Sequence, residues 1–156
     1  MLLLLMRHAD ALDEAASDYA RVLSDKGRKQ AERMGCWLKA ICDKPPVIVS
    51  SPYPRAFETA DIVAESLGDG SVARQDERLA PGLTPDLGSS LIHEFGDDAA
   101  GLLLVGHAPD LARLACHLIG AKESGIELRK GAVACLETVR AGHAGSTLQW
   151  LIHPKL

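Results

Sequence analysis

Three short, uninterrupted apolar runs constrain the fold of this chain more than any other feature. They are Leu2–Met6, Val47–Val49 and Leu102–Val105, and each is followed by polar residues or glycine. A run without polar alternation is typical of a strand that is buried on both faces, as in a parallel sheet covered by helices. We therefore expect these three runs to be strands of such a sheet.

Helical periodicity occupies the stretches between these runs. Ser24 is a suitable N-cap, and apolar residues behind it recur at three- and four-residue spacing. The predicted helices run from about Asp25 to Cys42, from about Pro54 to Leu67 with Gly68 as terminator, onward from Pro85 with Leu87, Leu91, Ile92 and Phe95 on one face, and from near Pro109 to Gly120. Strand and helix therefore alternate along most of the chain.

The last quarter of the chain has a different pattern. Val133–Val139 and Thr147–Ile152 are apolar or alternating runs joined by a glycine-rich turn, which predicts a β-hairpin. A weaker strand is expected at Ser71–Gln75. Together these elements predict an α/β fold, a three-layer α/β/α sandwich whose mostly parallel sheet has an antiparallel C-terminal edge. The length of 156 residues, 47% of them apolar, fits one domain over residues 1–156.

Charge and cysteine usage argue against several classes of protein. The formal charge of −4 offers no broad attraction to a nucleic acid or to an anionic membrane, so any anion site has to be local. The run Leu2–Met6 is too short for a signal peptide, and no stretch has the length of a membrane span. The cysteines show no metal-ligand spacing, and we expect them to be small core residues in a reducing, cytoplasmic compartment: Cys36, Cys42, Cys116 and Cys135.

Polar residues with a common chemistry follow the three buried strands. Arg7 and His8 leave the first strand, Ser50–Arg55 leaves the second, and Gly106-His107 leaves a later one. Ligands of open α/β sheets bind beyond the carboxyl ends of the strands, so we expect these residues to meet in one crevice.

Two arginines and two histidines in such a crevice suit phosphoryl transfer, which needs positive charge around the equatorial oxygens. The planar guanidinium groups of Arg7 and Arg55 can each bind two phosphate oxygens. We expect His8, its pKa lowered by these arginines, to attack phosphorus, and His107 to donate a hydrogen bond to the phosphoryl oxygens. The helix that starts near Pro109 adds its positive dipole end. The scheme needs no metal and no cofactor.

The same residues resemble the motifs of the histidine phosphatase superfamily. The opening Met6-Arg7-His8-Ala9-Asp10 is similar to the family's Arg-His-Gly motif, with Ala9 in place of glycine. Its second motif is similar to Ser51-Pro52-Tyr53-Pro54-Arg55-Ala56 with Thr59, and its second-histidine motif to Gly106-His107-Ala108-Pro109. Within the superfamily, the chain most resembles the small bacterial phosphohistidine phosphatases. The residues that carry this resemblance are Asp18-x-x-Arg21-x-Leu23, Leu83-Thr84-Pro85, and Trp150 before Pro154.

The resemblance implies a phosphoglycerate mutase-like fold and a role for each matching residue. The family's phosphohistidine nucleophile falls on His8 and its second histidine on His107. Its phosphate-clamping arginines fall on Arg7 and Arg55, while Asp18 and Arg21 are weaker matches that would line the entrance. The acidic proton donor of larger relatives has no counterpart in Arg78-Leu79-Ala80-Pro81, although Glu77 lies nearby.

A missing acid favours phosphohistidine as the substrate. An alkoxide leaving group needs a proton in the transition state, which is typically worth about 10²–10⁴-fold, whereas a leaving imidazole is a much weaker base. The chain also has no room for the large helical lid of bigger relatives. We therefore expect an open site that admits a phosphohistidine-bearing protein, such as a phosphotransfer domain.

Other interpretations remain open at this point. A phosphatase for a small sugar or nucleotide phosphate is the main alternative within the enzyme class. A metal-dependent hydrolase would use His8, Asp10 and His107, and a non-catalytic module would bind a phosphoryl group and release it unchanged. The remaining histidines and both tryptophans are expected to be surface or packing residues: His93, His117, His143, His153, Trp37 and Trp150.

Overall fold

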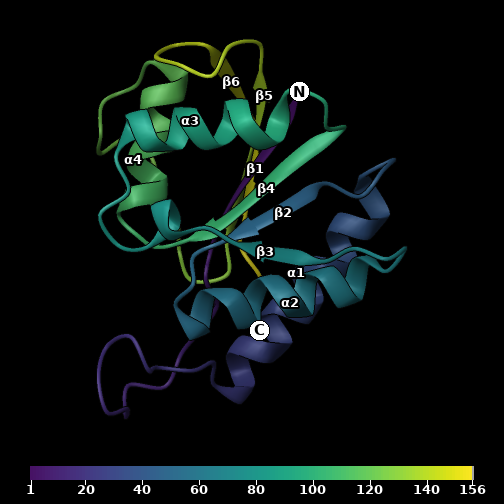
Figure 1. Cartoon of the computed structure of the whole chain (residues 1–156), viewed down its shortest axis with the longest axis vertical. Coiled ribbons are helices and arrows are strands. Elements are labelled where there is room, and N and C mark those ends of the chain that lie inside the picture. Colours follow the sequence, from purple (N-terminus) through teal and green to yellow (C-terminus); the bar gives the residue numbers. More distant parts are fainter. Residues whose placement is uncertain (156) are drawn as a thin grey trace.

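A six-stranded mixed sheet forms the middle layer of the computed structural model, which describes residues 1–155 (Figure 1). The strands are β1 (Leu2–Arg7), β2 (Val47–Ser50), β3 (Ala73–Gln75), β4 (Gly101–Gly106), β5 (Val133–Thr138) and β6 (Ser146–Ile152). Their order is β3-β2-β4-β1-β5-β6, with β3, β2, β4 and β1 parallel and β5 and β6 antiparallel at one edge. The three-layer sandwich with an antiparallel C-terminal edge is thus confirmed.

The helices cover both faces of this sheet. They are α1 (Asp25–Ile41), α2 (Pro54–Leu67), α3 (Pro85–Gly96) and α4 (Asp110–Ile119), with a short 3-10 turn η1 (Glu77–Leu79) before α3. Helices α1 and α2 lie together on one face, and α3 and α4 lie on the other (Figure 1). No helix within residues 1–155 is long and apolar enough to cross a membrane.

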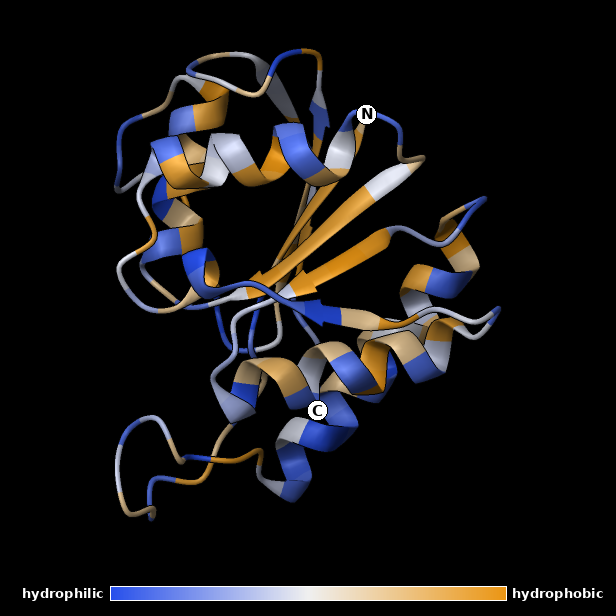
Figure 2. Cartoon of the chain, viewed as in Figure 1, coloured by the Kyte–Doolittle hydropathy of each residue, from blue (hydrophilic) through white to orange (hydrophobic). Residues whose placement is uncertain are grey.

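The apolar runs form the central strands because both of their faces are covered. Leu3, Leu4, Leu5 and Met6 of β1 have no exposed surface, and the same is true of Leu102–Val105 in β4. Figure 2 shows these strands as the most hydrophobic part of the sheet, enclosed by helices with hydrophilic outer faces. Alternate side chains of one strand therefore contribute to two separate cores, one under each helical layer.

Helix α1 begins where the sequence predicts. The Ser24 hydroxyl accepts a hydrogen bond from the backbone N–H of Gly27, which satisfies one of the free donors of the first turn. Gly27 also faces the backbone carbonyl of Asp10 so closely that a β-carbon there would collide with it. The start of α1 is therefore held against the loop that leaves β1.

Two expectations about exposure are wrong. Leu87, at the start of α3, is 39% exposed, because the buried face of that helix is made by Gly88, Leu91 and Ile92. Cys36 is also exposed, since it lies off the buried stripe of α1, and Cys42, the C-cap residue after α1, is only partly buried. Cys116 and Cys135 are core residues.

The predicted C-terminal hairpin is present as β5 and β6, with a register irregularity between Cys135 and Leu136. Its outer strand packs back on the α1 layer through Trp150, whose ring meets Trp37 edge-on at 4.8 Å between centroids. Both tryptophans therefore contribute to packing, as expected.

Candidate active site

The carboxyl ends of three adjacent strands bring the predicted site residues together. In the sheet, Arg7 of β1 pairs with Gly106 of β4, and Ser50 of β2 pairs with Val105. The residues that follow these positions therefore leave the sheet at the same level. Around them lies a cavity of about 290 Å³ lined by Arg7, His8, Asp18, Arg21, Arg55, Pro81, His107, Ala108 and Lys130.

The ring of His8 is buried and held in one tautomer. Its Nδ1 lies 2.8 Å from the backbone carbonyl of Ala9, which can only accept a hydrogen bond, so Nδ1 carries the proton. Its Nε2 accepts a hydrogen bond from Nε of Arg55 at 3.3 Å. Nε2 therefore carries the free electron pair that a nucleophile needs, and it faces the arginine.

Burial, more than positive charge, keeps His8 neutral. Desolvation lowers the pKa of His8 to about 3, while the hydrogen bond to Ala9 opposes this shift and the charges of His107, Arg55 and Arg7 add to it. The sequence predicts that the two arginines lower this pKa. The arginines lower the pKa in the predicted direction, but burial lowers it more, because only 5% of His8 is exposed to solvent.

Arg55 is buried in the first turn of α2 and binds the long loop that leaves β1. Its Nη1 donates to the carbonyl of Asp18 at 2.8 Å, and its Nη2 lies 3.2 Å from the Asp18 carboxylate. Thr59, one helical turn later, bonds the Arg55 carbonyl and accepts from the backbone N–H of Ala9. These buried hydrogen bonds of Thr59 connect helix α2 to the segment that carries His8.

His107 also lines the cavity and is neutral as well. Burial is the main cause that lowers its pKa to about 4, followed by the charge of Arg55. Its Nε2 lies 2.8 Å from the hydroxyl oxygen of Ser51, and the ring of Tyr53 stands edge-on at 5.1 Å between centroids. Its Nδ1 is buried and has no hydrogen-bond partner within residues 1–155. The two histidine rings are 5.4 Å apart between centroids.

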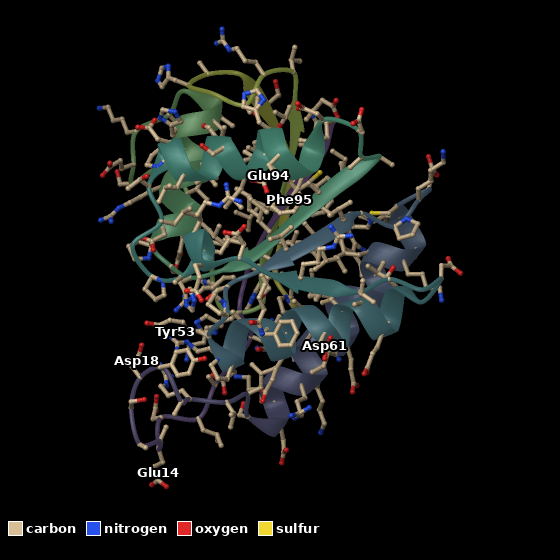
Figure 3. The ribbon with its side chains drawn as sticks, in the orientation of Figure 1. Glu14, Asp18, Tyr53, Asp61, Glu94 and Phe95 are labelled. Atoms are coloured by element: carbon tan, nitrogen blue, oxygen red, sulfur yellow. The ribbon has the colours of Figure 1, made fainter. Side chains whose placement is uncertain are left out.

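The loop between β1 and α1 projects from the body of the molecule and carries Asp18 to the cavity. Arg21 braces it by binding the carbonyl of Leu12 at 2.9 Å and the carboxylates of Asp13 and Asp18. In Figure 3, Asp18 lies beside Tyr53 at the base of this loop, whereas Glu14 lies at its far end. Asp18 and Arg21 therefore reach the rim of the cavity, where the sequence predicts them.

Three contributors to the site were missed from the sequence. Lys130 lines the cavity from the segment before β5, and nothing in its sequence context distinguishes it from other surface lysines. Ser51 and Tyr53 fall within a motif that was recognised, but their contacts with His107 depend on how two strand ends meet.

Glu77 and Asp10, the two carboxylates that the sequence offers as candidates, do not lie in the cavity with His8 and His107. Glu77 is exposed at the start of η1 and does not line the cavity. Asp10 binds the hydroxyl of Ser24 at 2.6 Å and Lys130 at 3.1 Å, and it lines a neighbouring cavity. Within residues 1–155, no three metal-ligating side chains are grouped as a metal site.

The arrangement can bind a tetrahedral dianion and attack it. Arg7, Arg55 and Lys130 supply positive charge, and their guanidinium and ammonium groups supply hydrogen-bond donors. A neutral imidazole with its electron pair on Nε2 stands beside them. This combination is what phosphoryl transfer to a histidine requires.

The sequence model of the histidine phosphatase superfamily (branch 1) matches residues 3–80, which are half of the chain. The chain belongs to this superfamily. The matched half contains His8 and Arg55, while His107 lies beyond it. Membership of this superfamily, together with similarity over nearly the whole chain to phosphohistidine phosphatase SixA, supports a hydrolase of the phosphatase type.

Comparison with individual proteins extends the likeness over the whole chain. Phosphohistidine phosphatase SixA of Escherichia coli (strain K12) is 28% identical over 99% of this chain and 94% of its own. A structure of the protein histidine phosphatase SixA complexed with tungstate matches with a TM-score of 0.87 and 27% identity, covering 99% of this chain and 97% of that one.

A mycobacterial glucosyl-3-phosphoglycerate phosphatase in complex with VO3 shares the fold, with a TM-score of 0.75 and 18% identity. That match covers 96% of this chain and 97% of the other.

Proposed function

We propose that this chain is a metal-independent phosphohistidine phosphatase, in which His8 takes the phosphoryl group from a phosphohistidine of a protein. The observation that carries the proposal is the state of the one carboxyl group in the cavity lining. Asp18 is paired with Arg55, whose charge is the main cause that lowers the pKa of this carboxyl. An ionised Asp18 has no proton to give to a leaving alkoxide.

The first step forms one bond and breaks another. The electron pair on Nε2 of His8 attacks phosphorus, and the P–N bond to the substrate's imidazole breaks. The substrate's phosphohistidine ring reacts with a proton on its other nitrogen, so the imidazole keeps the electron pair of the broken P–N bond and departs neutral without a proton from the enzyme. Before substrate binds, the Nε–H of Arg55 donates a hydrogen bond to Nε2 of His8. When that N–H donates to a phosphoryl oxygen of the substrate instead, the electron pair on Nε2 becomes free to attack.

The second step returns His8 to its starting state. Water attacks the phosphorus of phospho-His8, the P–N bond to Nε2 breaks, and inorganic phosphate leaves with the oxygen of the water. Arg7 and Arg55 neutralise charge on the equatorial oxygens. His107 donates a further hydrogen bond from Nδ1, which has no hydrogen-bond partner within residues 1–155. Phosphoryl transfer through such a covalent intermediate replaces one difficult displacement by two easier ones.

A side-by-side turnover assay tests the proposal. The substrates are a phosphohistidine-bearing phosphotransfer protein, a sugar phosphate and p-nitrophenyl phosphate, with a chelator present and no added metal. We expect preferential release of phosphate from the phosphohistidine protein by wild type and none by His8→Ala. The variant His93→Ala is the matched control, because His93 is an exposed histidine outside the cavity.

Each other outcome overturns a defined part of the proposal. Preference for the sugar phosphate would keep the phosphatase but replace the substrate by a small phosphorylated metabolite. Loss of activity with the chelator would contradict metal independence. Phosphate binding without turnover of any substrate would indicate a non-catalytic phosphoryl-binding module.

A further inference from the structure

A second cavity adjoins the site and is the larger of the two, at about 440 Å³. It lies between the start of α1, the segment before β5 and the residues after β6. Arg7 and Lys130 line both cavities, so these two side chains form the wall between them. A ligand held in the first cavity is therefore separated from the second by two cationic side chains.

The second cavity is cationic although the whole chain is acidic. Five of its lining side chains are arginine or lysine, against two carboxylates, whereas the formal charge of the chain is −4. One carboxylate, Asp10, is neutralised by Lys130 and bonded to Ser24. The other, Glu127, lies 3.5 Å from Arg129 with both side chains mostly exposed, a pairing of little strength. Within residues 1–155, Lys26 and Lys155 form no ion pair.

Arg7, in the wall between the two cavities, has a buried donor without a partner. Arg7 donates from Nη1 to the carbonyl of Leu128 at 3.3 Å, but its Nε is buried and has no hydrogen-bond partner within residues 1–155. Buried N–H groups of a protein are nearly always bonded, and one that is not calls for an explanation. Because Arg7 lines both cavities, an anion in either of them could supply the missing acceptor.

We propose that this second cavity binds an acidic side chain of the phosphohistidine protein, next to the phosphorylated histidine in the first cavity. The inference rests on the proposed function, because it assigns two adjacent cavities to one protein substrate. Most of the positive charge of the second cavity lies on exposed, long side chains, which can reach the carboxylates of a second protein: Lys26, Arg129 and Lys155. Electrostatic complementarity of this kind selects a partner and speeds its encounter.

The test compares two synthetic peptides of equal length that carry one phosphohistidine. One has aspartate and glutamate beside it, and the other has asparagine and glutamine in the same places. For wild type at low salt we expect kcat/KM to be about fivefold higher with the acidic peptide, the factor that corresponds to one favourable exposed ion pair. The ratio should approach one at high salt, because exposed charges are screened.

Two charge-reversal variants test whether the preference for the acidic peptide arises in the second cavity. Lys26→Glu should remove the preference for the acidic peptide or reverse it. Lys29→Glu is the matched control, since it makes the same charge change one turn along α1, at an exposed residue outside the cavity, and should leave the ratio at its wild-type value. Because the ratio compares two substrates of one enzyme preparation, partial misfolding of a variant cancels.

Three results would overturn the inference. Equal kcat/KM for both peptides in wild type would show that the second cavity does not sense acidic residues, while the proposed function would stand. An equal fall in the ratio for Lys29→Glu would show a general charge effect without a local site. Turnover of p-nitrophenyl phosphate with no turnover of either peptide would overturn the proposed function itself.

Discussion

Lowering the pH from 7.5 to 5.0 should destabilise the folded chain by about 4 kcal/mol through His8 and His107 alone. In the unfolded chain, each imidazole takes up a proton near its ordinary pKa of 6.5. In the folded chain, burial lowers the pKa values to about 3 and about 4. The unfolded state therefore binds more protons between these limits, and stability falls as the pH falls.

The magnitude follows from these pKa values. At pH 5.0 an unfolded histidine is almost fully protonated, whereas the two buried ones are almost fully neutral, and the difference amounts to about 2 kcal/mol for each group. At pH 7.5 the same difference is close to zero. Solvent does little to screen this effect, because the two histidines are only 4–5% exposed.

Urea unfolding at the two pH values measures this quantity in wild type, His8→Gln and His107→Gln. Each variant should show a pH dependence about 2 kcal/mol smaller than wild type, because one titrating group has been removed. His93→Gln, at an exposed histidine, should behave as wild type. An unchanged pH dependence in both buried-site variants would refute the assignment of these histidines as buried and neutral.

Three further substitutions give distinct expectations. Arg55→Lys keeps the charge but loses the planar fork, and should lower kcat/KM by about 10²-fold in a steady-state assay. Ser51→Ala removes the hydrogen bond to His107 and should lower kcat about tenfold with KM little changed; an equal rise in KM would contradict a positioning role. Gly27→Ala forces a β-carbon against the carbonyl of Asp10 and should lower the free energy of unfolding by about 1–3 kcal/mol; an unchanged urea midpoint would contradict that contact.

The sequence predicts the fold well because its strongest patterns report burial on both faces. The apolar runs of β1, β2 and β4 have no alternative place in a chain of this size, and the Ser24 cap fixes the start of α1. Exposure at the ends and edges of helices is less predictable. Leu87 and Cys36 are exposed because a helix buries only one stripe, and one residue of rotation decides which side chains lie on it.

The candidate site is predictable where residues follow strand ends and unpredictable where loops meet. Arg7, His8 and His107 are placed by the sheet itself. Lys130 and the contact between Asp18 and Arg55 depend on the path of two long segments, which no periodicity describes. The sequence also does not reveal that burial is the main cause of the low pKa of His8, because burial depends on the whole packed structure.

The most direct test of the account is to trap the phosphorylated enzyme. Wild type is mixed with a phosphohistidine protein labelled with radioactive phosphate, quenched with alkali within milliseconds, and digested for mass spectrometry. The account predicts a transient, alkali-stable and acid-labile label on the peptide that contains His8, and no label in His8→Ala. Turnover of the substrate with no label at His8, or with the label on another residue, would contradict it.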